Sequence, residues 1–285
     1  MKHTTSVESS AFIPVGELAE AFEKNSNVPP PSRDLQGMNL RLYLENGWII
    51  DHRFTTPSSL SWRNASRTIQ QHWIEEKYFA FRVRRGIYLV DFIRHLERAT
   101  TFSVVLDLER EISTVVIGQL PIRRATQEGL LDRAINGSEL TSVKATFLSG
   151  SINRPFDKKR IPRHQTTDEL VDRRIELNYS PTESYEHIYL NKGFFTWHCL
   201  AGAEKNEGLG LADTDVCRCL KLDGNLYLFV WREKIIPTLG VEAEDFDTMS
   251  TCGKIFGYKG HDFAKLSNFP IAAKMRMLAQ LRREG

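Results

Sequence analysis

The sequence has few cysteines and no long apolar run. Its 4 cysteines all lie in the second half of 285 residues, so we expect free thiols in a reducing, cytoplasmic compartment. No window approaches the roughly 18 consecutive apolar residues of a membrane span, which excludes a transmembrane helix. The segment before Phe12 lacks the apolar core of a secretory signal, so we expect no secretory leader.

An excess of charge of one sign is also missing. Lys and Arg total 38 against 36 Asp and Glu, a formal net charge of +2. Nucleic-acid-binding proteins usually carry a strongly basic face, so we expect neither nucleic acid nor a membrane as partner. A hydrophobic content of 41% and a charged content of 26% are typical of globular proteins. The oligomeric state stays open, with a homodimer as one option.

Short runs rich in β-branched and aromatic residues are present instead, separated by Gly, Asn, Pro and Ser. Such closely spaced runs predict antiparallel β-meanders. The first series of predicted strands comprises residues 40–44, 48–54, 59–63, 78–83, 87–92, 102–108 and 112–118. The second comprises residues 174–179, 185–190, 194–199, 216–222, 226–231, 238–246 and 251–258.

Three segments have helical spacing. Residues 15–22 predict a helix packed on the first domain, and residues 126–135 predict a helix that ends at Asn136-Gly137. Residues 271–282 predict an amphipathic C-terminal helix.

A polar and basic stretch around residue 160 is the best linker candidate. We therefore divide the chain into an N-terminal helix and arm (1–34), a first barrel (35–150), a linker (151–172) and a second barrel with a C-terminal helix (173–285).

The two β series align as an internal repeat. An acid–His–x–aromatic motif ending at Phe54 is followed after seven residues by Trp62, and the same motif ending at Tyr189 is followed after seven residues by Trp197. Matching aromatic strands, 87–92 and 226–231, follow in both copies. Closing each copy into a barrel removes exposed sheet edges. We therefore predict an all-β protein of two tandem antiparallel barrels.

Several stretches strongly resemble the MoaF family, labelled molybdenum cofactor biosynthesis protein F. In the second half they are SPTESYEHIYLNKGFFTWHCLAG, GLADTDVCRCLKL and LYLFVWREKIIPTLGVEAEDFDTMSTCGKIFGY. In the first half they are FIPVGELAEAF, ENGWIIDHRF, YLVDFIRHLERATTFSVVLDLE and VIGQLP. The resemblance runs from about Phe12 to Leu278 and implies two tandem lipocalin-like (calycin) barrels. Related barrels bind small apolar molecules, and some catalyse decarboxylation, dehydration, isomerisation or cycloaddition without a cofactor, which is an analogy at the level of fold.

Strand alternation places candidate site residues on shared faces in the second copy. His187 is the candidate general acid or base, and Tyr185 would polarise a substrate oxygen. Glu233 would be an acid with a raised pKa if it lies inward, although its charged neighbours also fit a solvated strand end. The candidate substrate-binding residues are Tyr189, Trp197, Tyr227, Phe229 and Trp231.

The first copy offers parallel substrate-binding candidates, namely His52, Trp62, Tyr88, Asp91 and Arg94. Arg94 aligns with Glu233, so the two lumens would differ in charge. For either copy the alternative is a solid core with hydrogen-bonded histidines. We favour the second copy as the active one because it carries more ionisable and phenolic groups.

Other site chemistries lack support in the sequence. Cys217 and Cys219 would share a face of one strand, but no C-x-x-C knuckle accompanies them, so we expect no metal. Neither G-x-G-x-x-G nor G-x-S-x-G occurs, which argues against a dinucleotide cofactor and a serine nucleophile. We expect no cofactor.

Together these features favour a cofactor-independent lyase, isomerase or pericyclase-type enzyme for a small apolar or aromatic metabolite. Dehydration of an alcohol to a reactive enone or quinone methide, followed by a guided hetero-Diels–Alder cycloaddition, would suit such a pocket. The alternative is a non-catalytic lipocalin-like binder, or an accessory protein of molybdenum cofactor synthesis.

Overall fold

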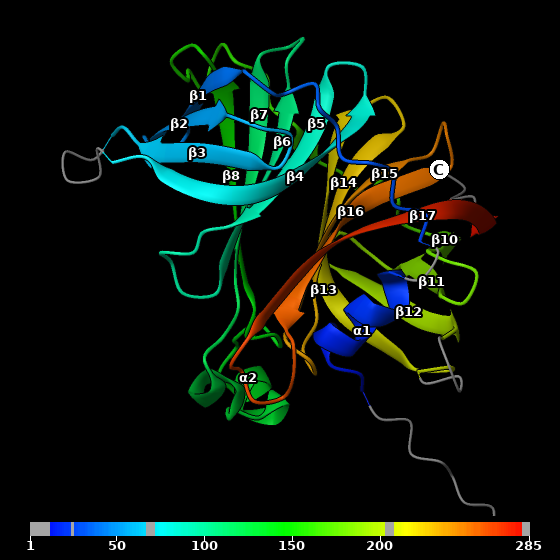
Figure 1. Cartoon of the computed structure of the whole chain (residues 1–285). Coiled ribbons are helices and arrows are strands. Elements are labelled where there is room, and N and C mark those ends of the chain that lie inside the picture. The colour runs from blue at the N-terminus through cyan, green and yellow to red at the C-terminus, as the bar shows by residue number, and fades with distance from the viewer. Residues whose placement is uncertain (1–11, 24–25, 67–71, 203–207, 281–285) are drawn as a thin grey trace, which may run out of the picture.

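The computed structural model describes residues 12–23, 26–66, 72–202 and 208–280. It confirms an all-β fold of two antiparallel barrels in tandem, accompanied by short helices (Figure 1). In the described residues no helix is both long and apolar enough to cross a membrane. The first barrel closes where the first of its strands pairs with the last. Its strands are β1 (Asn39–Leu44), β2 (Ile49–Phe54), β3 (Ser59–Asn64), β4 (Ile74–Arg84), β5 (Ile87–Ile93), β6 (Thr100–Asp107), β7 (Ile112–Gln119) and β8 (Lys144–Ile152).

The second barrel repeats this plan and closes through the pairing of β12 with β13. The short β9 (Gln165–Thr166) adds to β13 outside the ring. The strands of the ring are β10 (Arg173–Asn178), β11 (Ser184–Tyr189), β12 (Phe194–Ala201), β13 (Ala212–Asp223), β14 (Leu226–Arg232), β15 (Thr238–Asp245), β16 (Ser250–Tyr258) and β17 (Leu266–Gln280).

Register confirms the internal repeat. His52 on β2 lies directly opposite Trp62 on β3, and His187 on β11 lies directly opposite Trp197 on β12. The His and Trp of the repeated motif are thus cross-strand partners in both barrels.

The predicted C-terminal helix is wrong, because residues 266–280 form β17. This stretch is rich in helix-favouring Ala, Met and Leu, but β17 pairs with β16 on one side and β10 on the other. Its alternate residues Ile271, Ala273 and Met275 fill the second barrel. Tertiary pairing therefore overrides local helix propensity. A further strand, β8, was missed because its Lys, Ser and Gly content hides the alternation.

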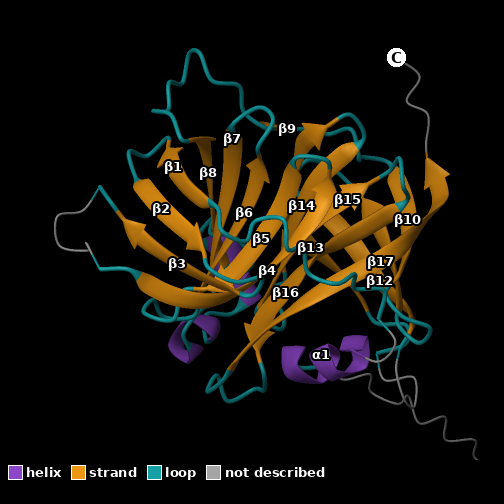
Figure 2. Ribbon diagram, turned by 45° about the horizontal axis from the view of Figure 1, so that its top comes forward, coloured by secondary structure: helices purple, strands orange, loops and turns teal. Residues whose placement is uncertain are grey.

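The N-terminal helix α1 (Val15–Glu23) forms where predicted but packs on the second barrel, not the first (Figure 2). Val15 rests on Gly257, where an added Cβ would lie 2.3 Å from its Cγ2. The Gly16 amide donates to the Lys259 carbonyl at 3.2 Å. These two contacts, with the backbone of Gly257 and of Lys259, thus place α1 over one end of the second barrel.

The middle helical segment divides into η1 (Arg123–Thr126) and α2 (Leu130–Ile135). As predicted, the helix ends at Asn136-Gly137, where Gly137 has a φ of +66°.

The two barrels pack through the outer faces of β5–β7 and β13–β16. A continuous apolar cluster joins residues such as Leu89 and Val105 of the first barrel to Leu228, Val241 and Phe256 of the second. These strands are therefore buried on both faces, one toward their own lumen and one toward the other barrel.

A buried ion pair crosses this interface. Lys254 Nζ lies 3.5 Å from Asp91 Oδ2, and both residues have no exposed surface. Lys254 also donates to Thr101 Oγ1 at 2.9 Å, while Ser103 and Asn268 donate to the two oxygens of Asp91. Burial lowers the pKa of Lys254.

We predict that Lys254→Met lowers the free energy of unfolding by about 3–5 kcal/mol, because Asp91 would be left as an uncompensated buried charge. Adding Asp91→Asn removes that charge and should recover most of the loss. Urea denaturation of the wild type, both single variants and the double variant measures this. A double variant no more stable than Lys254→Met would contradict the prediction.

Candidate functional site

A cavity of about 80 Å³ lies inside the second barrel beneath α1. Its walls are mostly aromatic and aliphatic, with a few polar groups, which is the usual composition of a small-molecule site. Phe12, Ile13, Leu18 and Phe22 of the N-terminal segment cover it from above. The barrel contributes Tyr179, Tyr185, His187, Phe195, Trp197, Cys199, Gly208, Leu211, Trp231, Glu233, Ile236 and Ile255.

His187 lies among aromatic rings at the base of the cavity. Its ring centroid is 5.1 Å from that of Phe195, 5.8 Å from Phe229 and 6.0 Å from Trp231. Burial in this apolar surrounding lowers its pKa to about 3, so the imidazole is neutral near pH 7. Its Nδ1 has no hydrogen-bond partner among the described residues. A buried, neutral and unpartnered nitrogen of this kind is available to a bound molecule.

Tyr185 lies above His187 on the same face of β11. Its ring contacts Trp197 at 6.3 Å and Phe22 of α1 at 6.0 Å between centroids. Burial raises the pKa of its phenol well above the usual value, so the hydroxyl keeps its proton. Tyr185 can therefore donate a hydrogen bond to an oxygen in the cavity.

A carboxyl group, that of Glu233, lies at the wall of the cavity, and Asp215 interacts with it from outside the lining. Burial, and next the charge of Asp215, raise the pKa of Glu233 to about 8. The two tryptophans each donate to one of these acids: Trp231 Nε1 to Glu233 at 3.1 Å, and Trp197 Nε1 to Asp215 at 2.9 Å. Glu233 therefore holds a proton at pH 7 and is placed beside the cavity, not at a solvated strand end. Asp215 was not among the predicted residues.

Two further acids, Glu242 and Glu244 on β15, point into the lumen below the cavity and were also missed. Tyr179 donates to Glu242 Oε1 at 2.9 Å, and Tyr189 donates to Glu244 Oε1 at 2.5 Å. Burial raises the pKa of each carboxyl to about 8. The only signal in the sequence is alternation in VEAED, which by itself places the acids on the solvent side.

Other predicted residues of the second barrel lie deeper than the cavity. The rings of Tyr189 and Phe229 form the layer beneath it, 5.2 Å apart between centroids. Tyr227 lies toward the far end of the lumen and donates to Glu169 at 2.7 Å. The structure thus brings together around the cavity the side chains of Tyr185, His187, Trp197, Trp231 and Glu233. Tyr189, Tyr227 and Phe229 lie outside it.

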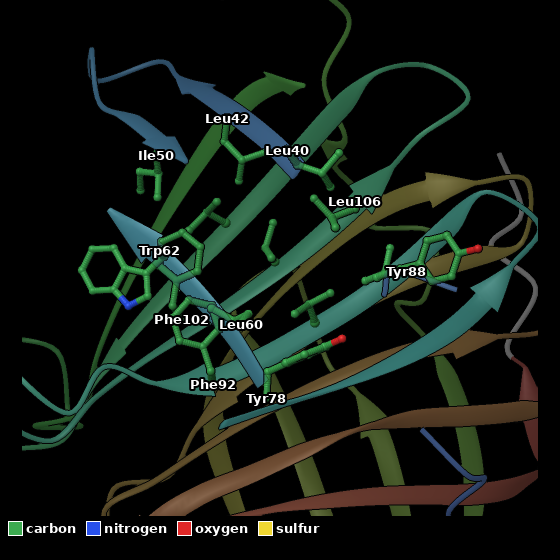
Figure 3. Packing of buried hydrophobic residues seen from close by; sticks show 14 of the residues in the cluster. Leu40, Leu42, Ile50, Leu60, Trp62, Tyr78, Tyr88, Phe92, Phe102 and Leu106 are labelled. Atoms are coloured by element: carbon green, nitrogen blue, oxygen red, sulfur yellow. The ribbon is translucent and has the colours of Figure 1, made fainter. Parts of the chain in front are cut away.

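The first barrel has a packed aliphatic and aromatic interior that includes Trp62 and Tyr88 (Figure 3). Burial, and next the charge of Arg94, lower the pKa of His52 to about 4. The Arg94 guanidinium lies 4.0 Å from the Trp62 ring centroid. Neither His52 nitrogen has a hydrogen-bond partner in the described part of the chain. The Tyr88 hydroxyl bonds Asp34 at 3.0 Å.

Asp91 does not join this group. It alternates with Val90 and Phe92 on β5 and therefore faces the second barrel, where it pairs with Lys254. The expectation that it lines the first lumen is corrected by the packing of the two barrels.

All four cysteines are free. Cys217 and Cys219 share the inner face of β13, as the spacing predicts, and belong to the apolar cluster of the second barrel. Burial raises the pKa of Cys217 to about 12, so the thiol stays protonated. Among the described residues, no group of three His, Cys, Asp or Glu side chains is arranged to hold a metal ion.

We predict that Asp215→Asn lowers the pKa of Glu233 from about 8, because it removes a neighbouring negative charge while Asn can still accept from Trp197. Carboxyl carbon NMR titration measures this. Glu186→Gln, on the outer face of β11, is the matched control and should leave the Glu233 titration unchanged. An unaltered Glu233 midpoint in Asp215→Asn would refute the coupling.

Comparison with known proteins matches both halves of the chain to one family. The MoaF N-terminal domain matches residues 10–122, and the MoaF C-terminal domain matches residues 164–281. Protein MoaF of Klebsiella aerogenes is 38% identical over 269 residues, covering 94% of this chain and 96% of that protein.

Among solved structures, a Burkholderia vietnamiensis protein described provisionally as a beta-lactamase covers 39% of this chain and 96% of its own, with 13% identity and a TM-score of 0.32. A likeness at that level says nothing about the activity of this chain. The two domain matches and the full-length relative show that the chain belongs to the MoaF family.

Proposed function

We propose that the second barrel is the site of a cofactor-independent lyase or isomerase that acts on a small, largely apolar or aromatic molecule. The supporting observation is a neutral His187 and a protonated Glu233 at one apolar cavity, both adjacent to Trp231. The pKa of Glu233, about 8, lies near neutral pH, as suits a general acid, and the neutral His187 has a nitrogen, without a partner among the described residues, that can accept a proton.

Dehydration of an alcohol illustrates the reaction class. His187 accepts a proton from the carbon next to the carbinol carbon, the C–O bond breaks, and Glu233 gives its proton to the leaving hydroxyl, which departs as water. A double bond remains in the product. The proton on His187 then returns to Glu233 through solvent, which restores both groups. Tyr185 donates to a substrate oxygen and stabilises the charge that develops there.

The shape of the cavity favours one small substrate. About 80 Å³ holds a few water-sized groups, so a two-component cycloaddition would need more room than this cavity offers. The aromatic side chains around the cavity suit a planar substrate, and Phe12, Ile13, Leu18 and Phe22 form part of its wall.

To identify the substrate, the purified protein is incubated with a metabolite extract, and bound and released species are compared by mass spectrometry. We predict that His187→Ala and Tyr185→Phe lower conversion of the species found by about 10²–10⁴-fold, as loss of a general base or an oxygen donor does. His52→Ala, the equivalent residue of the first barrel, is the matched control and should retain conversion.

If both His187→Ala and Tyr185→Phe left turnover intact, the proposal would be wrong. A molecule that binds the second barrel and returns unchanged would instead support a lipocalin-like carrier.

We predict that turnover is level near neutral pH and declines above about pH 8, because Glu233 then loses the proton it must donate. His187 imposes no limit there, since it is neutral above about pH 3. The pH–rate profile of conversion measures this. Asp215→Asn should move the decline to lower pH, and a profile that rises through pH 8 would contradict the assignment of Glu233 as the acid.

A further inference from the structure

We propose that the lumen below the cavity is a subsite for a protonated amine, held between Glu242 and Glu244. The inference rests on the proposed function in one respect, that the second barrel admits a small molecule. It adds that the end of this molecule that lies deepest in the barrel is a protonated amine.

The two acids form a pair by their position on one strand. They stand two residues apart on β15, which places their Cα atoms about 6.8 Å apart on the inner face. Neither has any exposed surface. Glu244 contributes to the raised pKa of Glu242, so the two carboxyl groups interact. One small cationic group between them lies within reach of both.

Each carboxyl has one oxygen bonded and one without a partner. Tyr179 and Tyr189 satisfy the Oε1 atoms, while Glu242 Oε2 and Glu244 Oε2 have no partner among the described residues. An ionised carboxylate would leave this oxygen desolvated, and a protonated one would leave its O–H without an acceptor. Neither protonation state is satisfied by the described side chains.

A third polar atom points to the same region. Thr251 on β16 is the cross-strand partner of Glu244, and its buried Oγ1 also has no partner in the described part of the chain. It shares the inner face with Ala273, its cross-strand partner on β17. The Nδ1 of His187 above and the Nε of Arg173, a donor, are also without a partner among the described residues. A ligand with several N–H donors can serve the acceptors Glu242 Oε2, Glu244 Oε2 and Thr251 Oγ1.

The folding of β15 does not itself require the acids. The outer face of the strand already packs through Val241 and Ala243 against the first barrel. Gly253 lies opposite Glu242 because the backbones approach closely there: an added Cβ would lie 2.1 Å from the Val241 carbonyl oxygen, 2.6 Å from Glu242 Cα and 2.8 Å from Glu242 Cγ. Glu242 is thus a fully buried carboxyl at a position where an apolar side chain would be less costly.

The charged and titratable groups around the pair decide the sign of the ligand. The inner faces of the neighbouring strands carry Tyr179, Tyr189, Cys217, Cys219, Arg173 and Tyr227, the last being the cross-strand partner of Glu244. Arg173 lies 4.5 Å from the Phe246 ring centroid and lowers the pKa of Glu244 only in part. Glu242 has no cation of its own among these groups, so a single positive charge suits the site.

An ammonium group fits these surroundings better than the alternatives. It donates to both Oε2 atoms, and the nearby Tyr179, Tyr189 and Phe229 rings favour a cation. An alcohol has one proton to donate and no charge. Tyr179 lines the cavity, and its hydroxyl donates to Glu242 below the cavity. The amine end of a ligand can therefore lie beside the Tyr179 hydroxyl, near Glu242, while the apolar end stays in the cavity.

The test compares two probes of equal length, 3-phenylpropylamine and the neutral 3-phenylpropan-1-ol, by isothermal titration calorimetry at pH 7. We predict that the wild type binds the amine at least tenfold more tightly. Glu242→Gln and Glu244→Gln should each abolish that preference, since glutamine keeps the acceptor for the tyrosine but cannot be charged. Glu186→Gln, a buried acid on the outer face of β11 paired with Arg174, should keep it.

A second readout needs no variant. With carboxyl pKa values of about 8, a bound cation should expel close to one proton per amine at pH 7, measured as the dependence of the heat on buffer ionisation enthalpy. Equal affinity for both probes, a preference that survives both glutamine variants, or binding of neither probe would overturn the subsite. If turnover depends on His187 but the protein does not prefer the amine, the subsite alone is wrong. If the protein prefers the amine but shows no turnover, the proposed function alone is wrong.

Discussion

Asp91 and Lys254 meet at the centre of an apolar interface that joins the outer faces of the two barrels, and much else in the molecule depends on that contact. Because β14–β16 are covered from outside by the first barrel, their outer faces need apolar residues. On β15 the outer positions are Val241 and Ala243, so the alternating Glu242 and Glu244 point inward, into the second lumen, while Lys254 of β16 stays on the outer face because Asp91 pairs with it. The interface thereby decides that Glu242 and Glu244 line the lumen, which a solitary barrel with a solvated outer face would not require.

The duplicated barrels use one framework for two different interiors. The repeated His and Trp are cross-strand partners in each copy, yet Arg94 covers Trp62 in the first while Glu233 accepts from Trp231 in the second. The first lumen is packed with aliphatic and aromatic side chains. The second contains a cavity whose wall includes Leu18 and Phe22 of the N-terminal helix.

Burial sets the protonation states that the second lumen offers. The same apolar surroundings remove the charge of His187 and of Glu233 by moving their pKa values in opposite directions. A site of this kind holds an uncharged base and an uncharged acid above, and two uncharged carboxyl groups below. These protonation states are what the proposed proton transfer and the proposed amine subsite depend on.

The sequence by itself determined the all-β class, the repeat and the inward faces of Tyr185, His187 and Trp231, because strand alternation and motif spacing are local properties. Alternation separates two faces but does not tell which one is inside when both are buried, so only tertiary structure assigned Glu242, Glu244 and Asp91. The same holds for α1, because its apolar face alone does not tell which barrel it packs on. The contact of Val15 with Gly257 of the second barrel decides this. It holds for β17 as well, since pairing with two neighbours outweighs the helix propensity of its residues.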